Sequence, residues 1–300
     1  MITEKQRIAR EKGIGSSDIG TILGINPWAT AYDLWLRRTK QVPEIKGNEA
    51  MDLGSALEVP ILALASKRLD AKIVRPRSVF VGAHKFMRAN LDGMIGSTVR
   101  GSPIVEAKTT GMSSAWGDEG SSDVPEYVKA QVMYQMMCSS SQTAHIACLV
   151  GDRGFKLKMF RVEYDSDYAQ HILDAVVRFW SCCQTMTAPT GTASLDVLKQ
   201  IKRNEDAVAV VAVNLFEEED RLKQIADTAQ KEADEARARL VVALGTAKRG
   251  QGGSYSITMS EVRSERFNAK LFQTEYPDIA SKFVTESSHT RISIKKAEPK

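Results

Sequence analysis

The sequence predicts a mixed α/β domain, with helices flanking a sheet of mixed strand directions, followed by an accessory module. Three observations support this fold class. Apolar residues recur at helical spacing in the first 70 residues, and a period of two replaces that spacing between residues 73 and 110. A helix, a hairpin and a second helix then follow. After "TAPTGT" the chain becomes charged and rich in alanine, so we expect a domain over residues 1–190 and an accessory module over 191–300.

The composition is that of a globular protein. Hydrophobic residues make up 43% and charged residues 26% of the 300 residues, and the formal net charge of +4 is compatible with a polyanionic partner without indicating one. No apolar run approaches the roughly 18 residues that span a bilayer, and the first residues do not resemble a secretory signal. The four cysteines form no CxxC pair and the four histidines are scattered. We therefore expect reduced thiols, a cytoplasmic location, no membrane partner and no histidine-based metal centre.

The first predicted elements are two short helices around a turn. Ser16 or Ser17 can cap the first helix, Gly24 can end it, and "NPW" at 26–28 is a turn signal. A second helix with Tyr32, Leu34 and Trp35 follows. A longer helical pattern then runs from 48 to 69, and we expect Pro60 to kink it or restart it after Glu58.

Strands and helices then alternate. The segments "IVRPRSVFV", "FMRANLDGMI" and "PIVEAKT" read as three strands. A helix over 125–139, a hairpin around 151–154 and a helix over 165–187 complete the domain. In the accessory module, the pattern over 205–243 predicts an amphipathic helix or helical hairpin that packs on its own chain, or a coiled-coil seam for another subunit. A flexible basic loop over 245–253, a strand and a last helix near 268–276 should follow.

Three polar residues stand out in the predicted strands. Glu106 and Lys108 lie two positions apart, so they project from the same face of a strand, and a simple salt bridge would explain them. Asp92 ends the preceding strand before a glycine, and a hairpin would place it beside Glu106. Two adjacent carboxylates repel each other unless a cation lies between them, and hard oxygen ligands suit Mg²⁺. A lysine on that face can orient an attacking water and stabilise charge on a phosphate.

This D-G and E-x-K arrangement resembles the PD-(D/E)xK nuclease superfamily, with Leu91 in place of the proline. The resemblance implies a restriction-endonuclease-like core in which one or two Mg²⁺ ions, replaceable by Mn²⁺, bind Asp92, Glu106 and the main-chain carbonyl of Ala107. Lys108 would then act on the nucleophilic water.

Two flanking segments extend the resemblance. Glu58 lies one helical turn after Gly54, and it is either a further metal ligand or an exposed helix glutamate. Gln131, Tyr134 and Gln135 are polar residues on an apolar helix, where they either make ordinary hydrogen bonds or support the site. In related nucleases a glutamine here supports the lysine and the water. RecB-type members show Q-x-x-x-Y, whereas this chain has tyrosine at the third step and glutamine at the fourth.

The N-terminal block "IGSSDIGTILGINPWATAYDLW" is similar to the opening of YqaJ-type phage exonucleases, which are relatives of lambda exonuclease. In the lambda enzyme an arginine and a serine of this block hold the 5′-phosphate, and they match Arg10 and Ser17, although Ser16 is equally placed. The chemistry fits, because arginine can bind a phosphate through two hydrogen bonds and a helix N-terminus attracts anions. Further basic residues either track DNA phosphates or form a solvated surface: Arg37, Arg38, Lys40, Arg75 and Arg77.

The resemblance implies a Mg²⁺-dependent 5′-to-3′ exonuclease that acts on double-stranded DNA ends in phage-type recombination. It also implies a toroidal homotrimer, a single-strand-annealing partner protein, and a phage or prophage gene expressed in the bacterial cytoplasm. One alternative is a structure-selective or Cas4-like nuclease, although the cysteine spacing does not suit a four-cysteine iron–sulfur cluster. The other is a non-catalytic DNA-binding scaffold, against which the intact Asp92, Glu106 and Lys108 argue.

Overall fold

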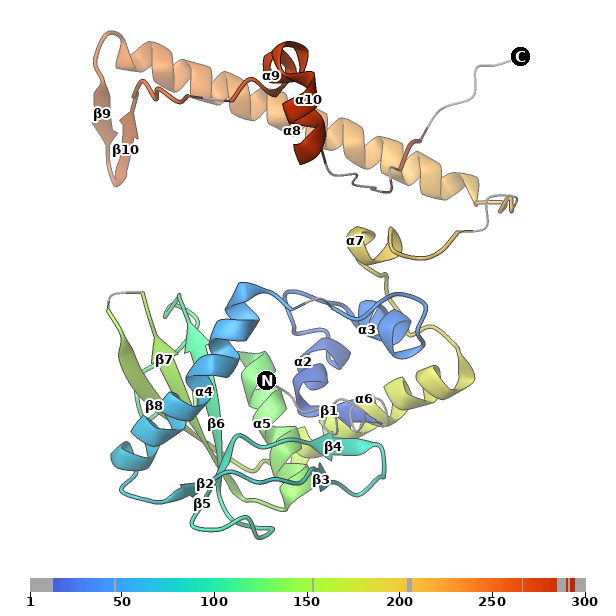
Figure 1. The fold of residues 1–300 in the computed structure, drawn as a ribbon, viewed down its shortest axis with the longest axis vertical. Helices are drawn as coiled ribbons and strands as arrows, with labels where there is room; N and C mark the ends of the chain where they lie inside the picture. Colours follow the sequence, from blue (N-terminus) through green and yellow to red (C-terminus); the bar gives the residue numbers. More distant parts are fainter. Residues whose placement is uncertain are drawn as a thin grey trace. The chain divides into compact units, whose positions relative to one another are not determined.

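The structure is a computed structural model that describes residues 13–45, 47–152, 154–203, 207–265, 267–284, 290 and 292–294. The chain divides into a first unit, Met1–Lys202 with Thr290–Lys300, and a second unit, Arg203–His289. The division follows Lys202 rather than residue 190, because Val197 is buried in the core of the first unit. Figure 1 shows the elements of both units.

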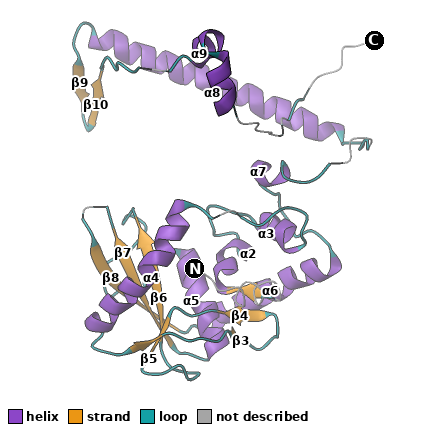
Figure 2. Cartoon of the chain, viewed as in Figure 1, coloured by secondary structure: helices purple, strands orange, loops and turns teal. Residues whose placement is uncertain are grey.

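The first unit contains helices and strands in alternation (Figures 1 and 2). Its helical elements are η1 (Ser16–Asp18), α2 (Ile19–Ile22), α3 (Ala31–Arg38), α4 (Glu49–Arg68), α5 (Glu126–Ser139), α6 (Ser166–Thr185) and α7 (Leu195–Leu198). Its strands are β1 (Ile14–Gly15), β2 (Ile73–Val74), β3 (Phe80–Val81), β4 (Met87–Ala89), β5 (Gly93–Ile95), β6 (Ile104–Thr110), β7 (Thr143–Val150) and β8 (Lys156–Glu163).

The strands form two sheets. One has five strands in the order β2-β5-β6-β7-β8, and the other has three in the order β1-β4-β3. In the larger sheet only β6 and β7 are parallel, because α5 connects them, and the remaining neighbours are antiparallel. The predicted mixed sheet is confirmed, and β6 lies at its centre.

Side-chain alternation along β6 divides the core into two layers. Val105 and Ala107 face α4 and pack with its Ile61, Leu62 and Ala65. Ile104 lies on the other face, in the larger cluster that includes Val128 and Val132 of α5. Because residues two apart share a face, Glu106 and Lys108 also face α5. The central strand therefore presents its charged residues to a buried helix.

Two of the three predicted strands are in fact broken. "IVRPRSVFV" separates into β2 and β3, and "FMRANLDGMI" separates into β4 and β5. In each case the two halves belong to different sheets, so the prediction of three continuous strands was wrong. The segment 90–92 carries the chain from the small sheet into the large one, and Asp92 is its last residue.

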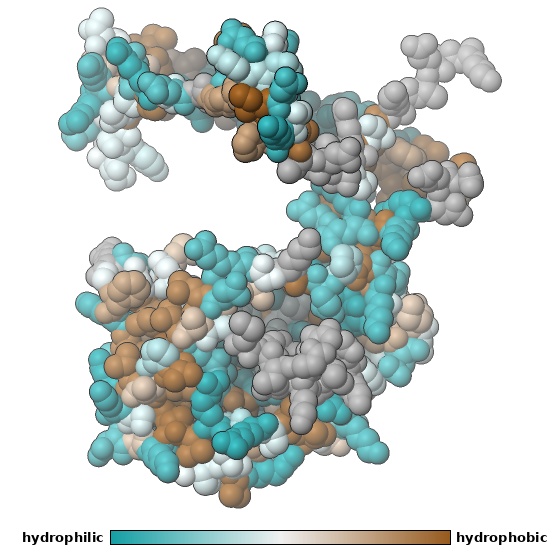
Figure 3. All heavy atoms as spheres, viewed as in Figure 1, coloured by the Kyte–Doolittle hydropathy of each residue, from teal (hydrophilic) through white to brown (hydrophobic). Residues whose placement is uncertain are grey.

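The helices follow the predicted ranges closely. The α4 helix begins after Asn48, whose side chain accepts a hydrogen bond from the Met51 N–H, and it continues through Pro60 without a break. The predicted restart is therefore absent. Pro60 and Ala56 are both exposed, so water can satisfy the carbonyl that lacks a donor. Figure 3 shows apolar atoms over α4, where Met51, Leu53, Val59 and Leu64 are exposed.

The second unit is built on one long helix. It contains α8 (Val213–Leu244), β9 (Arg249–Gly252), β10 (Tyr255–Thr258), α9 (Ala269–Glu275), α10 (Pro277–Ala280) and η2 (Ser281–Phe283). The α8 helix is continuous, and none of its residues is buried. The helical hairpin that was one of the predicted alternatives is therefore not formed. The predicted basic loop was wrong, because Arg249–Gly252 pairs with Tyr255–Thr258 as a hairpin. None of the helices in the described residues combines the length and apolarity needed to cross a membrane.

Candidate active site

Lys108 is held between a carboxylate and an amide. Its Nζ donates to Glu106 Oε1 at 2.6 Å and to Gln131 Oε1 at 3.0 Å. Burial by itself would lower the pKa of Lys108, but the charges of Glu106 and Asp92 and the hydrogen bond to Glu106 raise it above its usual value. Lys108 is therefore an ammonium group at neutral pH, suited to donate hydrogen bonds and to stabilise negative charge.

Two glutamines of α5 hold the carboxylate of Glu106, which is only 3% exposed. Gln131 Nε2 donates to Oε1 at 2.5 Å and Gln135 Nε2 donates to Oε2 at 2.8 Å. Residues one helical turn apart share a face of a helix, which explains how both amides reach one side chain. Gln135 was not assigned to the site from the sequence. The available signal was a second glutamine one turn after Gln131 in a strongly apolar helix.

Tyr134 lies away from this cluster. Its hydroxyl donates to the main-chain carbonyl of Ile14 at 3.0 Å, and the side chain is fully buried. Burial raises the pKa of this hydroxyl, which therefore stays protonated. Tyr134 joins α5 to β1, and Gln135 occupies the supporting position beside Glu106.

Asp92 lies opposite Glu106. The register pairs Gly93 with Val105, so the next pair along the two strands is Asp92 and Glu106. The Ala107 N–H donates to Asp92 Oδ2 at 2.9 Å. Burial raises the pKa of Asp92 well above its ordinary value, and repulsion from Glu106 and, more weakly, Glu58 raises it further, against the opposing effects of Lys108 and the Ala107 N–H. The structure thus brings the two predicted carboxylates together.

Glu58 and Gly54 lie nearby on α4. Glu58 forms an ion pair with Arg75, yet its charge still acts on Asp92. A Cβ atom at Gly54 would lie 3.7 Å from Thr109 Oγ1, an ordinary contact, so Gly54 faces the end of β6 without being sterically required there. The pair with Arg75 is made through Glu58 Oε1.

The donor set around Asp92 fits a hard divalent cation. It consists of the Asp92 and Glu106 carboxylates and the Ala107 main-chain carbonyl. Among the described residues, no three or more His, Cys, Asp or Glu side chains form a metal-binding group. Mg²⁺ does not need such a cage, since it usually takes one or two carboxylates and completes its shell with water and phosphate oxygens. Burial and then the charge of Glu106 raise the pKa of Asp92, and a bound cation would oppose both effects by favouring the ionised carboxylate.

The two serines of the N-terminal block differ in accessibility. Ser16 is buried, and its Oγ lies 3.5 Å from Gln135 Nε2, whereas Ser17 is exposed. Asp18 Oδ2 accepts from the Gly15 N–H at 3.0 Å and forms an ion pair with Arg38. Arg10, the other predicted phosphate ligand, lies outside the described residues. Ser16 therefore contacts the glutamine that holds Glu106, and Ser17 is free to meet a ligand.

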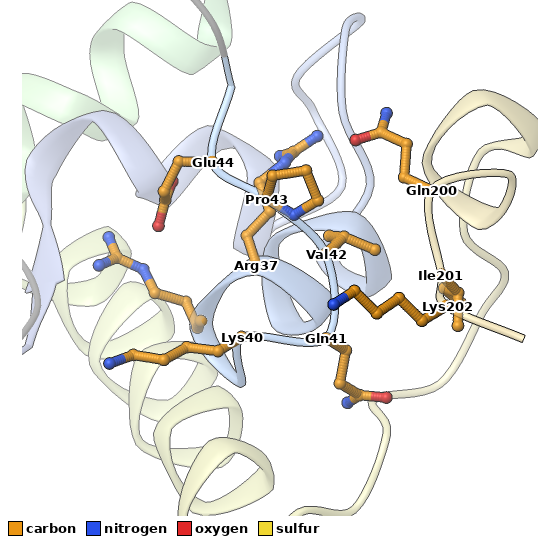
Figure 4. A pocket seen from close by; sticks show the side chains of 10 residues that line it. Arg37, Lys40, Gln41, Val42, Pro43, Glu44, Gln200, Ile201 and Lys202 are labelled. Carbon is orange, nitrogen blue, oxygen red and sulfur yellow. The ribbon is translucent and has the colours of Figure 1, made fainter. Parts of the chain in front are cut away.

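A basic cavity of about 940 Å³ lies beside this turn. Figure 4 shows its lining, in which Gln200 and Lys202 lie across from the segment 41–43 at the end of α3. Arg37, Arg38 and Lys40 supply further positive charge, and Glu44 is the acidic residue of the lining. Of the other basic residues predicted to face DNA, Arg75 is paired with Glu58 and Arg77 is exposed. The Arg38–Asp18 pair connects the cavity to the turn that carries the serines.

Comparison with known proteins shows what this part of the chain is similar to. Residues 7–142 match the family model described as a YqaJ-like viral recombinase domain. Over 310 aligned residues the chain is 29% identical to YqaJ of Bacillus subtilis (strain 168), and the alignment covers 98% of this chain and 95% of that protein. Residues 7–142 are therefore similar to a YqaJ-like viral recombinase domain, and the resemblance drawn from the N-terminal block is confirmed.

Solved structures with a similar arrangement are also known. An alkaline exonuclease from Laribacter hongkongensis is 18% identical with a TM-score of 0.48, and the alignment covers 62% of this chain and 94% of that one. A phage-related exonuclease from Haemophilus somnus 129PT is 11% identical with a TM-score of 0.43, and the alignment covers 59% of this chain and 96% of that one.

Proposed function

We propose that this chain, whose residues 7–142 match the model of a YqaJ-like viral recombinase domain, is a Mg²⁺-dependent nuclease that hydrolyses phosphodiester bonds at the ends of double-stranded DNA. One observation carries the proposal. Asp92 and Glu106 lie opposite each other on neighbouring strands, with Lys108 bonded to Glu106 on the face that meets α5. Two carboxylates and an ammonium in this arrangement suit hydrolysis of a phosphate ester better than a purely structural ion pair.

Asp92, Glu106 and the Ala107 carbonyl would hold Mg²⁺, and Mn²⁺ would substitute for it. When bound, the ion supplies Lewis-acid chemistry at the phosphate and lowers the pKa of water. Gln131 and Gln135 fix both oxygens of Glu106, so the carboxylate needs little reorganisation to bind an ion. Glu58, which pairs with Arg75 through Oε1, would be a further ligand.

Lys108 and Gln131 would orient the attacking water and stabilise charge on the phosphate. The raised pKa of Lys108 supports the electrostatic part of this role, because a protonated amine cannot act as a general base. The hydrogen bond between Lys108 and Gln131 fixes the ammonium at the position where that charge develops.

The finer assignments belong to the same proposal. Arg10 and Ser17 would bind the 5′-phosphate, with Ser16 behind them, which sets a 5′-to-3′ direction. The cavity lined by Arg37, Lys40 and Lys202 would hold backbone phosphates of the duplex. The biological setting would be phage-type recombination in the bacterial cytoplasm, with a single-strand-annealing partner and a homotrimeric assembly.

The test uses end-labelled linear duplex and covalently closed circular duplex, each with Mg²⁺ or EDTA. The expected result is that only the linear DNA is degraded, and only when Mg²⁺ is present. Cleavage of the circle would favour a structure-selective endonuclease, and binding without cleavage would favour the scaffold. Linear duplex with 5′-hydroxyl ends should be degraded much more slowly than duplex with 5′-phosphate ends.

Lys108→Ala should lower the cleavage rate by roughly 10²-fold or more, because removal of one group that stabilises transition-state charge costs about that much. Lys156→Ala is the matched control, since Lys156 is an exposed lysine of β8. DNA affinity and the folded-state circular dichroism spectrum should be nearly unchanged in both variants, whereas Lys108→Ala should melt at a lower temperature because the buried Glu106 loses its counter-charge. Retained cleavage in Lys108→Ala would refute the assigned role.

A further inference from the structure

Trp28 is an exposed aromatic side chain beside the candidate active site. It is 73% exposed in the turn between α2 and α3, whereas Trp35 and Trp116 are buried. A tryptophan gains most of its stabilising contact area when it is buried, so this degree of exposure calls for another explanation.

The backbone at Trp28 is fixed although its side chain is exposed. The Gly20 carbonyl accepts from the N–H groups of Ile25 at 2.9 Å and Asn26 at 3.0 Å. Asn26 Nδ2 donates to Thr21 Oγ1 at 2.7 Å, and Asn26 Oδ1 accepts from the Trp28 N–H at 2.9 Å. Thr21 is buried, so these bonds anchor the turn to the core. Trp28 is thus presented by an ordered turn.

Contacts connect Trp28 to Lys108 through one residue. The Trp28 and Tyr127 rings are 5.3 Å apart between centroids and nearly perpendicular, at 79°. Tyr127 lies one helical turn before Gln131, which accepts a hydrogen bond from Lys108. Tyr127 and Lys108 also interact electrostatically. Trp28 is therefore separated from the surroundings of Lys108 by a single side chain, that of Tyr127.

We propose that Trp28 is a stacking platform for a nucleobase of the DNA strand whose phosphate lies at Lys108. The inference rests on the proposed function and adds a residue that positions the substrate. An indole face suits a flat, apolar ligand, and every base offers a π face, so the contact would be independent of sequence. The perpendicular Tyr127 ring supports the indole edgewise and leaves the exposed indole surface to a base.

The test combines two variants of the full-length protein with two substrates. Trp28→Ala removes the platform and Trp28→Phe keeps an aromatic ring. Val99→Ala is the control for loss of an exposed apolar side chain, since Val99 is 67% exposed and lies in the turn at the far end of β6. The substrates are linear duplexes with 5′-phosphate ends, either intact or with abasic sites at the last three nucleotides of the 5′ strand.

Trp28→Ala should raise KM on the intact substrate by about 10-fold, the size of one lost base-stacking contact, with kcat changed less. Trp28→Phe should restore most of the loss, and Val99→Ala should have no effect. On the abasic substrate the KM of the wild type should rise by a similar factor, whereas the KM of Trp28→Ala should not rise further. The reason is that the two changes remove the same contact. Equal abasic penalties in both proteins would overturn the proposal.

Failure of the proposed function has a different signature. If the wild type binds both DNA substrates but cleaves neither, the proposed nuclease function is refuted. The stacking proposal is then tested by equilibrium binding. In that measurement the tryptophan fluorescence of the wild type should be quenched by intact DNA more than by abasic DNA, and Trp28→Phe should lose this difference. Equal quenching in the two proteins, or no binding by the wild type, would overturn the stacking platform as well.

Discussion

At the scale of single residues, Glu106 shows how a buried charge is made tolerable in this fold. Its oxygens accept hydrogen bonds from Lys108, Gln131 and Gln135, so the carboxylate is paired and satisfied although it is almost fully buried. Asp92 differs, because its only hydrogen bond among the described residues is from the Ala107 N–H. The Glu106 carboxylate is therefore fixed by its hydrogen bonds, whereas the Asp92 carboxylate can still bind a cation.

Asp92→Asn should stabilise the protein in EDTA. The pKa of Asp92 is raised in the folded state, so the folded chain binds this proton more tightly than the unfolded chain does. Stability is therefore lost as pH rises through the folded-state pKa, and the neutral asparagine removes that loss. We expect the melting temperature of Asp92→Asn to rise by roughly 2–4 °C for each kcal/mol of unfolding free energy gained. This rise should be larger at pH 8 than at pH 5.

Differential scanning calorimetry without Mg²⁺, and at Mg²⁺ concentrations that increase in 10-fold steps, completes this test. Mg²⁺ should raise the melting temperature of the wild type in proportion to the logarithm of its concentration and have little effect on Asp92→Asn. Equal stabilisation of both proteins by Mg²⁺ would mean that Asp92 is not a metal ligand.

Part of the candidate site was predictable at this scale. Glu106, Lys108 and Asp92 follow from alternation and register, which are local properties of neighbouring strands. Gln135 does not, because α5 is buried on nearly all sides and no amphipathic stripe indicates which face meets β6. The choice between Tyr134 and Gln135 depends on how α5 docks, which is a property of the tertiary structure.

At the scale of elements, the close packing of α2 against α5 positions the N-terminal block. A Cβ atom at Gly20 would lie 2.7 Å from the Cβ of Tyr127, closer than real side chains approach. Only glycine allows this approach, so α2 and the turn that carries Trp28 depend on it for their place beside α5.

Gly20→Ala should therefore destabilise the protein by about 1–3 kcal/mol, the usual cost of inserting a group into a well-packed contact. Gly111→Ala is the matched control, because nothing lies within 4 Å of a Cβ at that position. Urea unfolding followed by circular dichroism would measure both. A Gly20→Ala midpoint equal to that of Gly111→Ala would show that the two helices can separate at no cost.

The helices were predicted more accurately than the short strands, for a physical reason. Long helices such as α6 carry many repeats of their apolar period, whereas β2 to β5 span two or three residues each. A run of alternating residues cannot show that the chain changes sheets midway, as it does at 90–92. The glycine-rich β9 was missed because glycine favours turns, and pairing with β10 overrides that preference.

At the scale of the whole molecule, the first unit contains the complete candidate site and both core clusters. Its boundary is set by the segment 193–202. Ser194 donates to Asp33 Oδ1 through its N–H at 2.8 Å and its Oγ at 3.1 Å, and Val197 is buried. This segment is part of the folded domain, although it follows the composition change after Thr192.

A chain ending at Lys202 should thus fold and melt like the first unit of the full-length protein. A chain ending at Thr192 should melt about 5–10 °C lower, since it loses a buried valine and two hydrogen bonds to a buried aspartate. Scanning calorimetry of both truncated chains decides this. Identical melting temperatures would show that residues 193–202 contribute nothing to the domain.

The hydrogen bonding of Glu106 has a consequence for biosynthesis. On the ribosome, β5 and β6 emerge as neighbours, but Gln131 and Gln135, which donate hydrogen bonds to Glu106, are synthesised later. At roughly 5–20 residues per second the nascent hairpin would hold two facing acids for a second or more without their amide partners. Lys108 emerges with the hairpin and offsets part of their repulsion, so what waits for α5 is the burial of Glu106 and the completion of its hydrogen bonds.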